Sequence, residues 1–417
     1  PPDGNHLEES GGDGGMKWET YKLKQLCSEI VDCVNKTAPT SDVPTPYKML
    51  RTSDIRDGKI NLENLNCVTK EVYEKWTRRG KLQKGDVIFT REAPLGEVGL
   101  VREEKNYFLG QRLVLFRANN KMCDGRFLMY SLLWRDNKQA IISKGVGSTV
   151  AHLRVPECEN IEIKVPDLDV QHRIADILSA YDDLIENNQK QIKLLEEAAQ
   201  RLYKEWFVDL RFPGHENTKI VDGVPEGWSK STVSEVSAVL RRGISPKYNE
   251  KARGIVINQK CIRQTIVSYD EARTQEKKYP AELEMMESDI VICSTGAGTL
   301  GRVGQIFEAK GNATLDSHVT LIRANEKIGR QSLFWSLKMK QDYLMNAGKG
   351  STNQLELSRE TIGSCEILIP ERKIAEQVEK NFVAIHNKMK ECSMQIARLR
   401  EARDLLLPKL MSGEAEV

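Results

Sequence analysis

The sequence predicts an α+β protein: two duplicated, mostly β domains separated by two long helices that form an antiparallel coiled coil, in a pseudo-twofold dumbbell. Three observations predict this fold class. Motifs of the first half recur in order in the second half, Gly and Pro separate short β-branched runs in each half, and each half ends in a stretch almost free of both residues. A chain of 417 residues, 40% of them hydrophobic, can bury more than one core.

The duplication rests on five pairs of matched segments. The pairs are 86–99 with 289–304, 115–119 with 321–325, 125–128 with 329–333, 144–149 with 349–352, and 161–166 with 366–370. The displacement between partners is always 203 to 206 residues. Chance matches would not keep both the order and the spacing, so the chain contains two copies of one unit.

Each copy divides into a β-rich part and a helical part. Residues 17–166 and 213–370 contain short β-branched runs between Gly and Pro, which predicts mostly β domains with a few helices. Residues 167–212 are predicted to form the central coiled-coil helix, and residues 371–417 the distal helix and a C-terminal tail. Residues 1–16 contain five Gly and four acidic residues but no Lys or Arg, which predicts a disordered leader.

Both helical parts carry seam residues spaced alternately four and three positions apart, which is typical of a coiled coil. The first seam consists of Ile174, Leu178, Tyr181, Ile185, Asn188, Ile192, Leu195, Ala199, Leu202 and Trp206. The second consists of Val378, Phe382, Ile385, Met389, Cys392, Ile396, Leu399, Arg403 and Leu406. A buried Asn188 would fix the register of the pair, and the alternative is a seam position that faces water.

Positive charge is concentrated on the β-rich domains. Residues 17–166 carry a formal charge of +7 and residues 213–370 a charge of +2, whereas residues 167–212 carry −4. Since DNA affinity depends on neutralising phosphates, a nucleic-acid surface is expected on the β-rich domains. The helices are then expected to act as spacers or as surfaces for protein partners.

The junctions between domain and helix resemble those of a known family. Pro166-Asp-Leu-Asp-Val-Gln171-His-Arg-Ile174 closes a domain and opens a long helix, and residues 396–413 form a similar far end. Together with the duplicated Leu-Gly strands and Gly-Ser-Thr loops, these segments resemble the specificity (S) subunits of type I restriction–modification enzymes. The second junction, Pro370-Glu-Arg-Lys-Ile374, departs from the pattern because it lacks the Gln-x-x-Ile step.

The resemblance implies a function and a set of partners. Each β-rich unit would be a target recognition domain that reads one half of a split site in double-stranded DNA. The helices would be the spacer that docks adenine methyltransferase subunits, two of them, and two restriction–translocation subunits would join that core. The subunit itself would be a non-catalytic, cytoplasmic protein without cofactor or membrane segment.

Two other classes of function stay open at the level of the sequence. One is a coiled-coil scaffold whose duplicated domains bind two protein partners and no DNA. The other is an enzyme, such as a site-specific nuclease, whose catalytic residues come together only in the fold. No motif favours the enzyme, because the six His residues show no metal-ligand spacing and the nine Cys residues include no CxxC pair. Reduced, buried thiols are the expectation for the cysteines.

Two glycine-rich segments imitate nucleotide-binding loops. Residues 296–301 match GxGxxG, but the residues that follow read as a strand, whereas a dinucleotide loop must open a helix. Residues 348–352 lack the first Gly of a P-loop. Both are therefore expected to be turns, and no cofactor is predicted.

Candidate DNA contacts are polar and basic residues in loops, because such side chains reach phosphates and base edges. The duplicated Gly-Ser-Thr loops and the basic clusters flanked by Gly supply most of them. The candidates are Arg78, Arg79, Lys81, Arg91, Lys144, Ser148, Thr149, Arg241, Arg242, Lys247, Lys349, Ser351 and Thr352. An ordinary turn or a solvated surface is the alternative for each.

Overall fold

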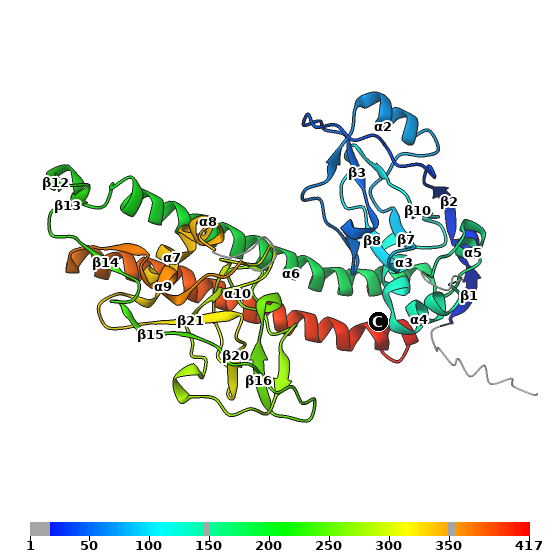
Figure 1. Ribbon diagram of the computed structural model, residues 1–417. Coiled ribbons are helices and arrows are strands. Elements are labelled where there is room, and N and C mark those ends of the chain that lie inside the picture. Colours follow the sequence, from blue (N-terminus) through cyan, green and yellow to red (C-terminus); the bar gives the residue numbers. More distant parts are fainter. Residues whose placement is uncertain (1–16, 146–150, 349–354) are drawn as a thin grey trace, which may run out of the picture. The chain divides into compact units, whose positions relative to one another are not determined.

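The computed structural model describes residues 17–145, 151–348 and 355–417 (Figure 1). The expected leader, residues 1–16, lies outside the described residues. The chain forms two compact units: unit 1 runs to Ile185 and includes Ala397–Val417, and unit 2 is Glu186–Ile396. Each unit therefore contains one β-rich region and part of each long helix. The predicted α+β fold class with a duplicated unit is confirmed.

Unit 1 is built around a four-stranded antiparallel sheet in the order β2-β10-β7-β8 and a three-stranded mixed sheet in the order β6-β3-β9. Its elements are β1 (Glu19–Lys22), α1 (Leu23–Leu26), β2 (Cys27–Asp32), β3 (Lys48–Leu50), β4 (Ile55–Arg56), β5 (Lys59–Ile60), β6 (Asn66–Cys67), α2 (Lys70–Trp76), β7 (Val87–Arg91), β8 (Leu95–Leu100), β9 (Tyr107–Leu109), β10 (Leu113–Ala118), α3 (Gly125–Leu133), α4 (Arg135–Ser143), α5 (Val155–Glu159) and β11 (Glu162–Val165).

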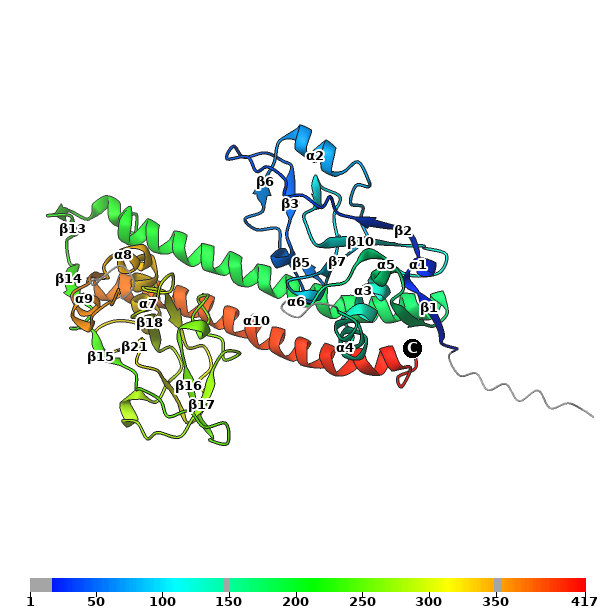
Figure 2. The same cartoon turned by 45° about the vertical axis from the view of Figure 1, so that its right-hand side comes forward.

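Unit 2 repeats this plan, with the sheet orders β15-β21-β18-β19 and β17-β16-β20 (Figure 2). Its elements are β12 (Ile220–Val221), β13 (Val224–Pro225), β14 (Ser229–Thr232), β15 (Ser237–Arg242), β16 (Gly254–Ile257), β17 (Arg273–Gln275), β18 (Ile290–Cys293), β19 (Val303–Gln305), β20 (Ala313–Leu315), β21 (Val319–Ala324), α7 (Arg330–Met339), α8 (Gln341–Asn346), α9 (Arg359–Gly363) and β22 (Glu366–Ile369).

The four-stranded and mixed sheets of the two units match strand by strand, which supports the duplication independently of the sequence motifs. In both mixed sheets the first two strands in chain order pair antiparallel, and a later strand joins in parallel. The first and last strands of each region also pair, β1 with β11 and β14 with β22.

Residues 296–301, which match GxGxxG, form a turn that leads into strand β19, as expected, and not into a helix.

Both faces of the four-stranded sheet are buried, because its side chains alternate between two cores. In unit 1, Val87 and Phe89 pack in the core that also contains α3, whereas Ile88 packs in a second core with residues of the mixed sheet. In unit 2, Ile292 and Val291 divide in the same way. This explains why these strands read as continuous apolar runs.

A buried aspartate lies at the same place in both units. Asp86 accepts hydrogen bonds from Nε and Nη2 of Arg117, both at 2.9 Å, and Asp289 accepts them from Arg323 at 2.8 and 2.7 Å. Each carboxylate also accepts a backbone N–H at 2.7 Å, from Gln83 or Met286. The repeated Asp at the start of β7 and β18 is thus explained by a structural ion pair.

The long helices are α6 (Leu168–Tyr203), continued by a π-helical turn at Lys204–Val208, and α10 (Arg372–Ser412). Within each unit they pair antiparallel (Figures 1 and 2). In unit 1, Arg403 donates to Asp182 at 2.6 Å; in unit 2, the Cys392 Sγ lies 3.5 Å from the Gln191 Oε1. Asn188 is only 6% exposed, so the alternative that it faces water is wrong.

The seam residues also pack against the β-rich regions, which the heptad pattern alone does not predict. Ile174 and Leu178 share a core with α3 in unit 1, and Val378 and Phe382 share one with α7 in unit 2. The physical reason is that an apolar stripe on a helix can contact more than one neighbour at once. The helices therefore belong to the cores of both units.

Candidate nucleic-acid interface

The segment between the first and second strands of the four-stranded sheet, in chain order, differs most between the units. We call residues 33–85 lobe 1 and residues 243–288 lobe 2. All five repeated sequence segments lie outside the lobes, although each lobe supplies two antiparallel strands to the mixed sheet of its unit. Within each unit, the lobe lies on the side of the sheet away from the long helices (Figures 1 and 2). The molecule thus presents two lobes of like topology and different sequence.

Both lobes carry an excess of positive charge. Lobe 1 has eleven Lys and Arg residues against six Asp and Glu residues. Lobe 2 as a whole has eight basic against seven acidic residues, and its excess is confined to residues 243–279, with eight basic against four acidic residues. Because phosphate neutralisation supplies much of the affinity for DNA, these segments are the best candidates for a nucleic-acid surface.

The first basic cluster directly follows helix α2 of lobe 1. Arg78 is exposed and has no ion-pair partner among the described residues. Arg79 donates to the Cys33 carbonyl at 3.1 Å, which attaches the end of α2 to the end of β2. The Lys81 ammonium lies 5.9 Å from the centre of the Tyr73 ring. Arg78 and Lys81 are therefore the members of this cluster that remain available to a ligand.

Arg91 and Arg242 have equivalent structural roles. In unit 1, Arg91 pairs with Asp32 at 3.0 Å and donates to the Leu153 carbonyl at 3.2 Å. In unit 2, Arg242 donates to the Leu357 carbonyl at 3.0 Å. Both leucines follow a Gly-Ser-Thr loop in the chain, so each arginine fixes the segment that leaves that loop. Contact of either guanidinium with DNA would require breaking these bonds.

The remaining candidates divide into paired, exposed and undescribed residues. Arg241 forms an ion pair with Glu282, and Lys247 forms one with Glu276. Lys144 is exposed at the C-terminal end of α4. The other candidates lie outside the described residues; they are Ser148, Thr149, Lys349, Ser351 and Thr352.

Sequence reasoning missed an exposed pair in lobe 2. The Cζ of Arg273 lies 3.5 Å from the centre of the Tyr248 ring, so the guanidinium stacks on the phenol. The two residues are 25 positions apart, and only the pairing of their strands brings them together. The interleaving of aromatic and basic residues over 247–253 was the available signal.

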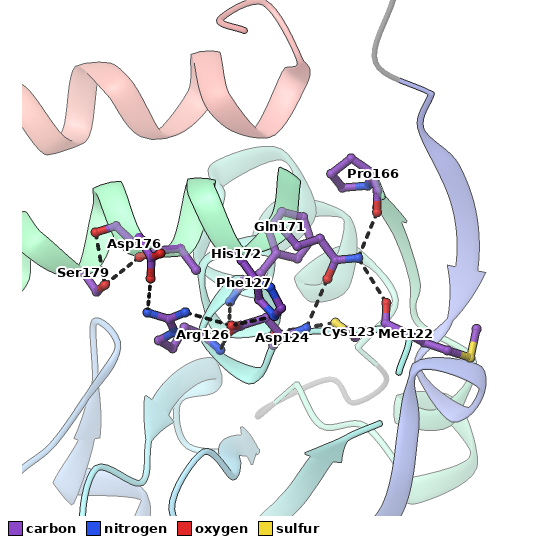
Figure 3. Close-up of polar contacts among 11 residues, drawn as sticks. Met122, Cys123, Asp124, Arg126, Phe127, Pro166, Gln171, His172, Asp176 and Ser179 are labelled. Carbon is purple, nitrogen blue, oxygen red and sulfur yellow. Dashed lines mark hydrogen bonds and ion pairs between the residues drawn. The ribbon is translucent and has the colours of Figure 1, made fainter. Parts of the chain in front are cut away.

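Gln171 of the first junction connects α6 to the start of α3 (Figure 3). Its side-chain amide donates to the carbonyls of Pro166 at 2.8 Å and Met122 at 3.0 Å, and its Oε1 accepts the Asp124 N–H at 3.1 Å. Asp124 in turn caps α3 by accepting the backbone N–H of Arg126 at 2.7 Å. The motif residue therefore has a structural role.

Unit 2 makes an equivalent connection with a different residue, which accounts for the missing Gln-x-x-Ile step. Glu379 of α10 accepts the backbone N–H groups of Gln331 at 3.0 Å and Ser332 at 2.8 Å, in the first turn of α7. It also accepts the Ser332 hydroxyl at 2.7 Å. A carboxylate at a helix N-terminus is stabilised by the free N–H groups there. Both units thus connect a long helix to the start of a preceding domain helix, α3 or α7.

A pocket of about 790 Å³ lies in unit 1 between α3, the end of β8 and α6. Arg102 and Asp183 form an ion pair at 2.5 Å in its wall. Tyr130, also in the wall, donates to the buried Asp182 at 2.7 Å, and burial raises the pKa of the Tyr130 phenol. These contacts join the β-rich region of unit 1 to α6.

The described residues show no group of three or more His, Cys, Asp or Glu side chains arranged to hold a metal ion. All nine cysteines are free, and seven of them are buried, as expected. Among the described helices, none is long and apolar enough to cross a membrane.

Comparison with known proteins finds similarity to specificity subunits of type I restriction enzymes. Residues 16–197 match the model described as type I restriction modification DNA specificity domain. The type I restriction enzyme HindI specificity subunit of Haemophilus influenzae is 24% identical and aligns over 95% of this chain and 99% of its own length. The MjaIX specificity subunit of Methanocaldococcus jannaschii is 26% identical over 80% of this chain and 78% of its own.

A solved structure extends the likeness to the fold of both units. The crystal structure of a type I restriction–modification S subunit from M. genitalium aligns over 97% of this chain and 98% of its own, with a TM-score of 0.61 and 18% identity. The resemblance seen in the sequence is therefore confirmed: this chain is similar to type I restriction enzyme specificity subunits along nearly its whole length, and it shares the fold of a solved S subunit.

Proposed function

We propose that this chain is the DNA-binding specificity subunit of a type I restriction–modification complex and that it recognises a bipartite site. The observation that carries the proposal is the pair of lobes, which share a topology and an excess of positive charge but not a sequence. Two lobes with a similar backbone and different side chains suit a DNA site that consists of two different half-sequences. In this proposal lobes 1 and 2 lie in the target recognition domains 17–166 and 213–370.

The long helices are the proposed docking surface for protein partners. Exposed aliphatic side chains remain on them although their seams are filled: Leu184 and Leu405 in unit 1, and Leu194, Val383 and Met394 in unit 2. Exposed aliphatic side chains on a helix leave apolar area that a protein partner can cover. We assign the methyltransferase subunits, two in number, to these helices (167–212 and 371–417), and the two restriction–translocation subunits to the resulting core in the cytoplasm.

Selection from random duplexes tests the DNA-binding proposal. The full chain, with and without its methyltransferase partner, is expected to enrich two defined half-sequences separated by a spacer of fixed length and variable sequence. The logarithm of the association constant should fall with the logarithm of the salt concentration by about 0.9 for each phosphate contact. Binding that neither enriches a sequence nor depends on salt would favour the scaffold instead.

A separate incubation tests the proposal that the chain is non-catalytic. The pure chain with Mg²⁺, ATP, S-adenosylmethionine and the selected duplex should neither cleave nor methylate the DNA. Adding the methyltransferase subunit should start methylation at the selected site. Cleavage or methyl transfer by the chain alone would overturn this part of the proposal.

A further inference from the structure

The backbone of lobe 2 fixes Tyr248 and Arg273 next to each other. Residues 247–249 lie along the free edge of β17: Asn249 donates its N–H to the Thr274 carbonyl at 3.3 Å, and Glu276 donates its N–H to the Lys247 carbonyl at 2.9 Å. Tyr248 itself forms a β-bridge with Gln275. The segment therefore extends the mixed sheet by one short strand. Backbone hydrogen bonds before and after Tyr248 fix its position next to Arg273.

The guanidinium of Arg273 is exposed and uncompensated. It has no carboxylate partner among the described residues, whereas nearby acidic side chains are already engaged. Glu276 pairs with Lys247 and accepts a hydrogen bond from Asn249, and Glu271 lies 3.8 Å from Arg263. Tyr248 is 44% exposed, so the stack lies at the surface of the lobe.

A stacked guanidinium is prepared for bidentate recognition. The aromatic ring covers one face of the planar group and restricts its rotamers, while the N–H donors at its edge stay free. Less conformational entropy is then lost when the group binds. Two N–H donors on one edge of the guanidinium match two acceptors in the major groove of DNA, O6 and N7 of guanine.

Further unpaired cations gather at the same end of the sheet. Gly254, the first residue of β16, pairs with Gln275, the last residue of β17, so the segments next to them in the chain meet there. Lys251 and Arg253 precede β16, and Lys278 follows β17; all three are exposed and have no ion-pair partner within the described ranges. Phosphates on either side of a contacted base would lie near such charges.

We propose that Arg273, oriented by Tyr248, reads a guanine in the half-site bound by lobe 2, while Lys251, Arg253 and Lys278 bind neighbouring phosphates. The inference rests on the proposed function, since it requires the chain to bind a specific DNA site. It goes beyond that function by assigning the reading of one base to a residue pair.

The test compares the full-length wild-type chain with Arg273→Ala on the selected duplex and on duplexes with each base pair of both half-sites replaced in turn. Arg273→Ala should weaken binding to the selected duplex about tenfold to hundredfold. It should also abolish discrimination at a single G·C pair of one half-site and leave every other position unchanged. Arg273→Lys should lose the same discrimination, because the lysine ammonium lacks the planar pair of N–H donors.

Matched variants separate reading from charge and from folding. Tyr248→Phe keeps the ring and should keep discrimination, whereas Tyr248→Ala should reduce it at the same base pair. Arg253→Ala should weaken all duplexes alike and lower the salt slope by about 1. Thermal unfolding of each variant should match that of the wild type, because the changed side chains are exposed.

Two results would overturn the inference while leaving the proposed function intact. In the first, Arg273→Ala weakens all duplexes equally, which would make Arg273 a phosphate contact. In the second, it changes nothing. If the wild-type chain selects no sequence at all, the proposed function fails and this inference fails with it.

Discussion

Two buried carboxylates in this protein are each satisfied by several hydrogen bonds. Asp86 and Asp289 each accept two hydrogen bonds from one arginine and one from the backbone, and both are almost fully buried. Removing one partner of such a pair leaves a charge without compensation in a medium of low polarity. The stability of the four-stranded sheets therefore depends strongly on these residues.

Asp86→Asn should destabilise unit 1 by about 3 kcal/mol, because Arg117 would keep its charge, lose its buried carboxylate partner and be left with the half-exposed Glu29. Urea unfolding followed by tryptophan fluorescence measures the change. Glu74→Gln, an exposed carboxylate of α2, is the control and should change stability by less than about 0.5 kcal/mol. A loss below about 1 kcal/mol for Asp86→Asn would mean that the ion pair contributes little.

His386 gives unit 2 a defined acid sensitivity. Its ring is buried in α10 and lies 4.2 Å from the Phe307 ring; its Nδ1 is 3.2 Å from the Gln305 Oε1, and its Nε2 lacks a partner among the described residues. Burial lowers its pKa to about 4, while nearby Glu287 and Lys390 have opposite, smaller effects. The folded state therefore requires the neutral imidazole.

The stability contributed by neutral His386 should be complete above pH 6.5 and should fall as the pH drops from 6.5 towards 4, because only the unfolded chain binds the proton there. The expected loss is about 3 kcal/mol. Thermal unfolding between pH 7.5 and 4.5 measures it. His386→Leu should flatten this dependence, and His215→Asn, at a half-exposed position, should not.

At the scale of elements, the long helices are connected to the domains through helix N-termini. Gln171 binds the loop before α3, and Glu379 binds the first turn of α7. Both residues lie on the face of a long helix that turns towards its domain. Different chemistry thus performs one structural role in the two units.

Gln171→Glu should destabilise unit 1 by about 2 kcal/mol, because a carboxylate cannot donate to the Pro166 and Met122 carbonyls and would repel Asp124. Glu379→Gln should cost unit 2 less, about 1 kcal/mol, because the one remaining acceptor oxygen, that of the amide, still accepts an N–H group in the first turn of α7. Thermal unfolding of both variants checks which of them loses more stability. Equal losses would show that the charge of Glu379 matters more than its hydrogen bonds.

The elements that could be predicted from the sequence are those with a local signal. The heptads predicted α6 and α10, and the β-branched runs at 87–89, 255–257 and 290–292 all lie in strands. The partners of Arg91 and Arg242 could not be predicted, because they depend on the pairing of strands far apart in the sequence. The same holds for Arg273 and Tyr248, which the candidate list omitted although Lys247 was on it.

At the scale of the whole molecule, each unit has its own cores and its own lobe. The core of unit 1 also includes Leu406, Leu410 and Met411 from the far end of the chain. A domain that replaces the first β-rich region must therefore offer apolar residues that pack against these three side chains. With that condition met, the two units should act on DNA almost independently.

Replacing residues 17–166 with the matching domain of a relative should change one selected half-sequence and leave the other unchanged. The reciprocal exchange of residues 213–370 is the matched control and should change only the other half. Site selection on both chimaeras decides this. If either exchange alters both halves, the proposal of two separate readers is wrong.

The position of lobe 1 in the chain also bears on how new specificities can arise. The lobe leaves the sheet after β2 and returns at β7, and both of these strands pair antiparallel with β10, so it is attached to the rest of the unit at two strands of one sheet. A gene segment encoding residues 33–85 can thus be inherited as a cassette, with crossovers at the end of β2 and the start of β7. The incoming cassette needs to offer apolar side chains opposite Ile88 and Leu115, and the acceptor keeps its Asp86 ion pair unchanged. Recombination within such genes would then generate new DNA sites at little risk to folding.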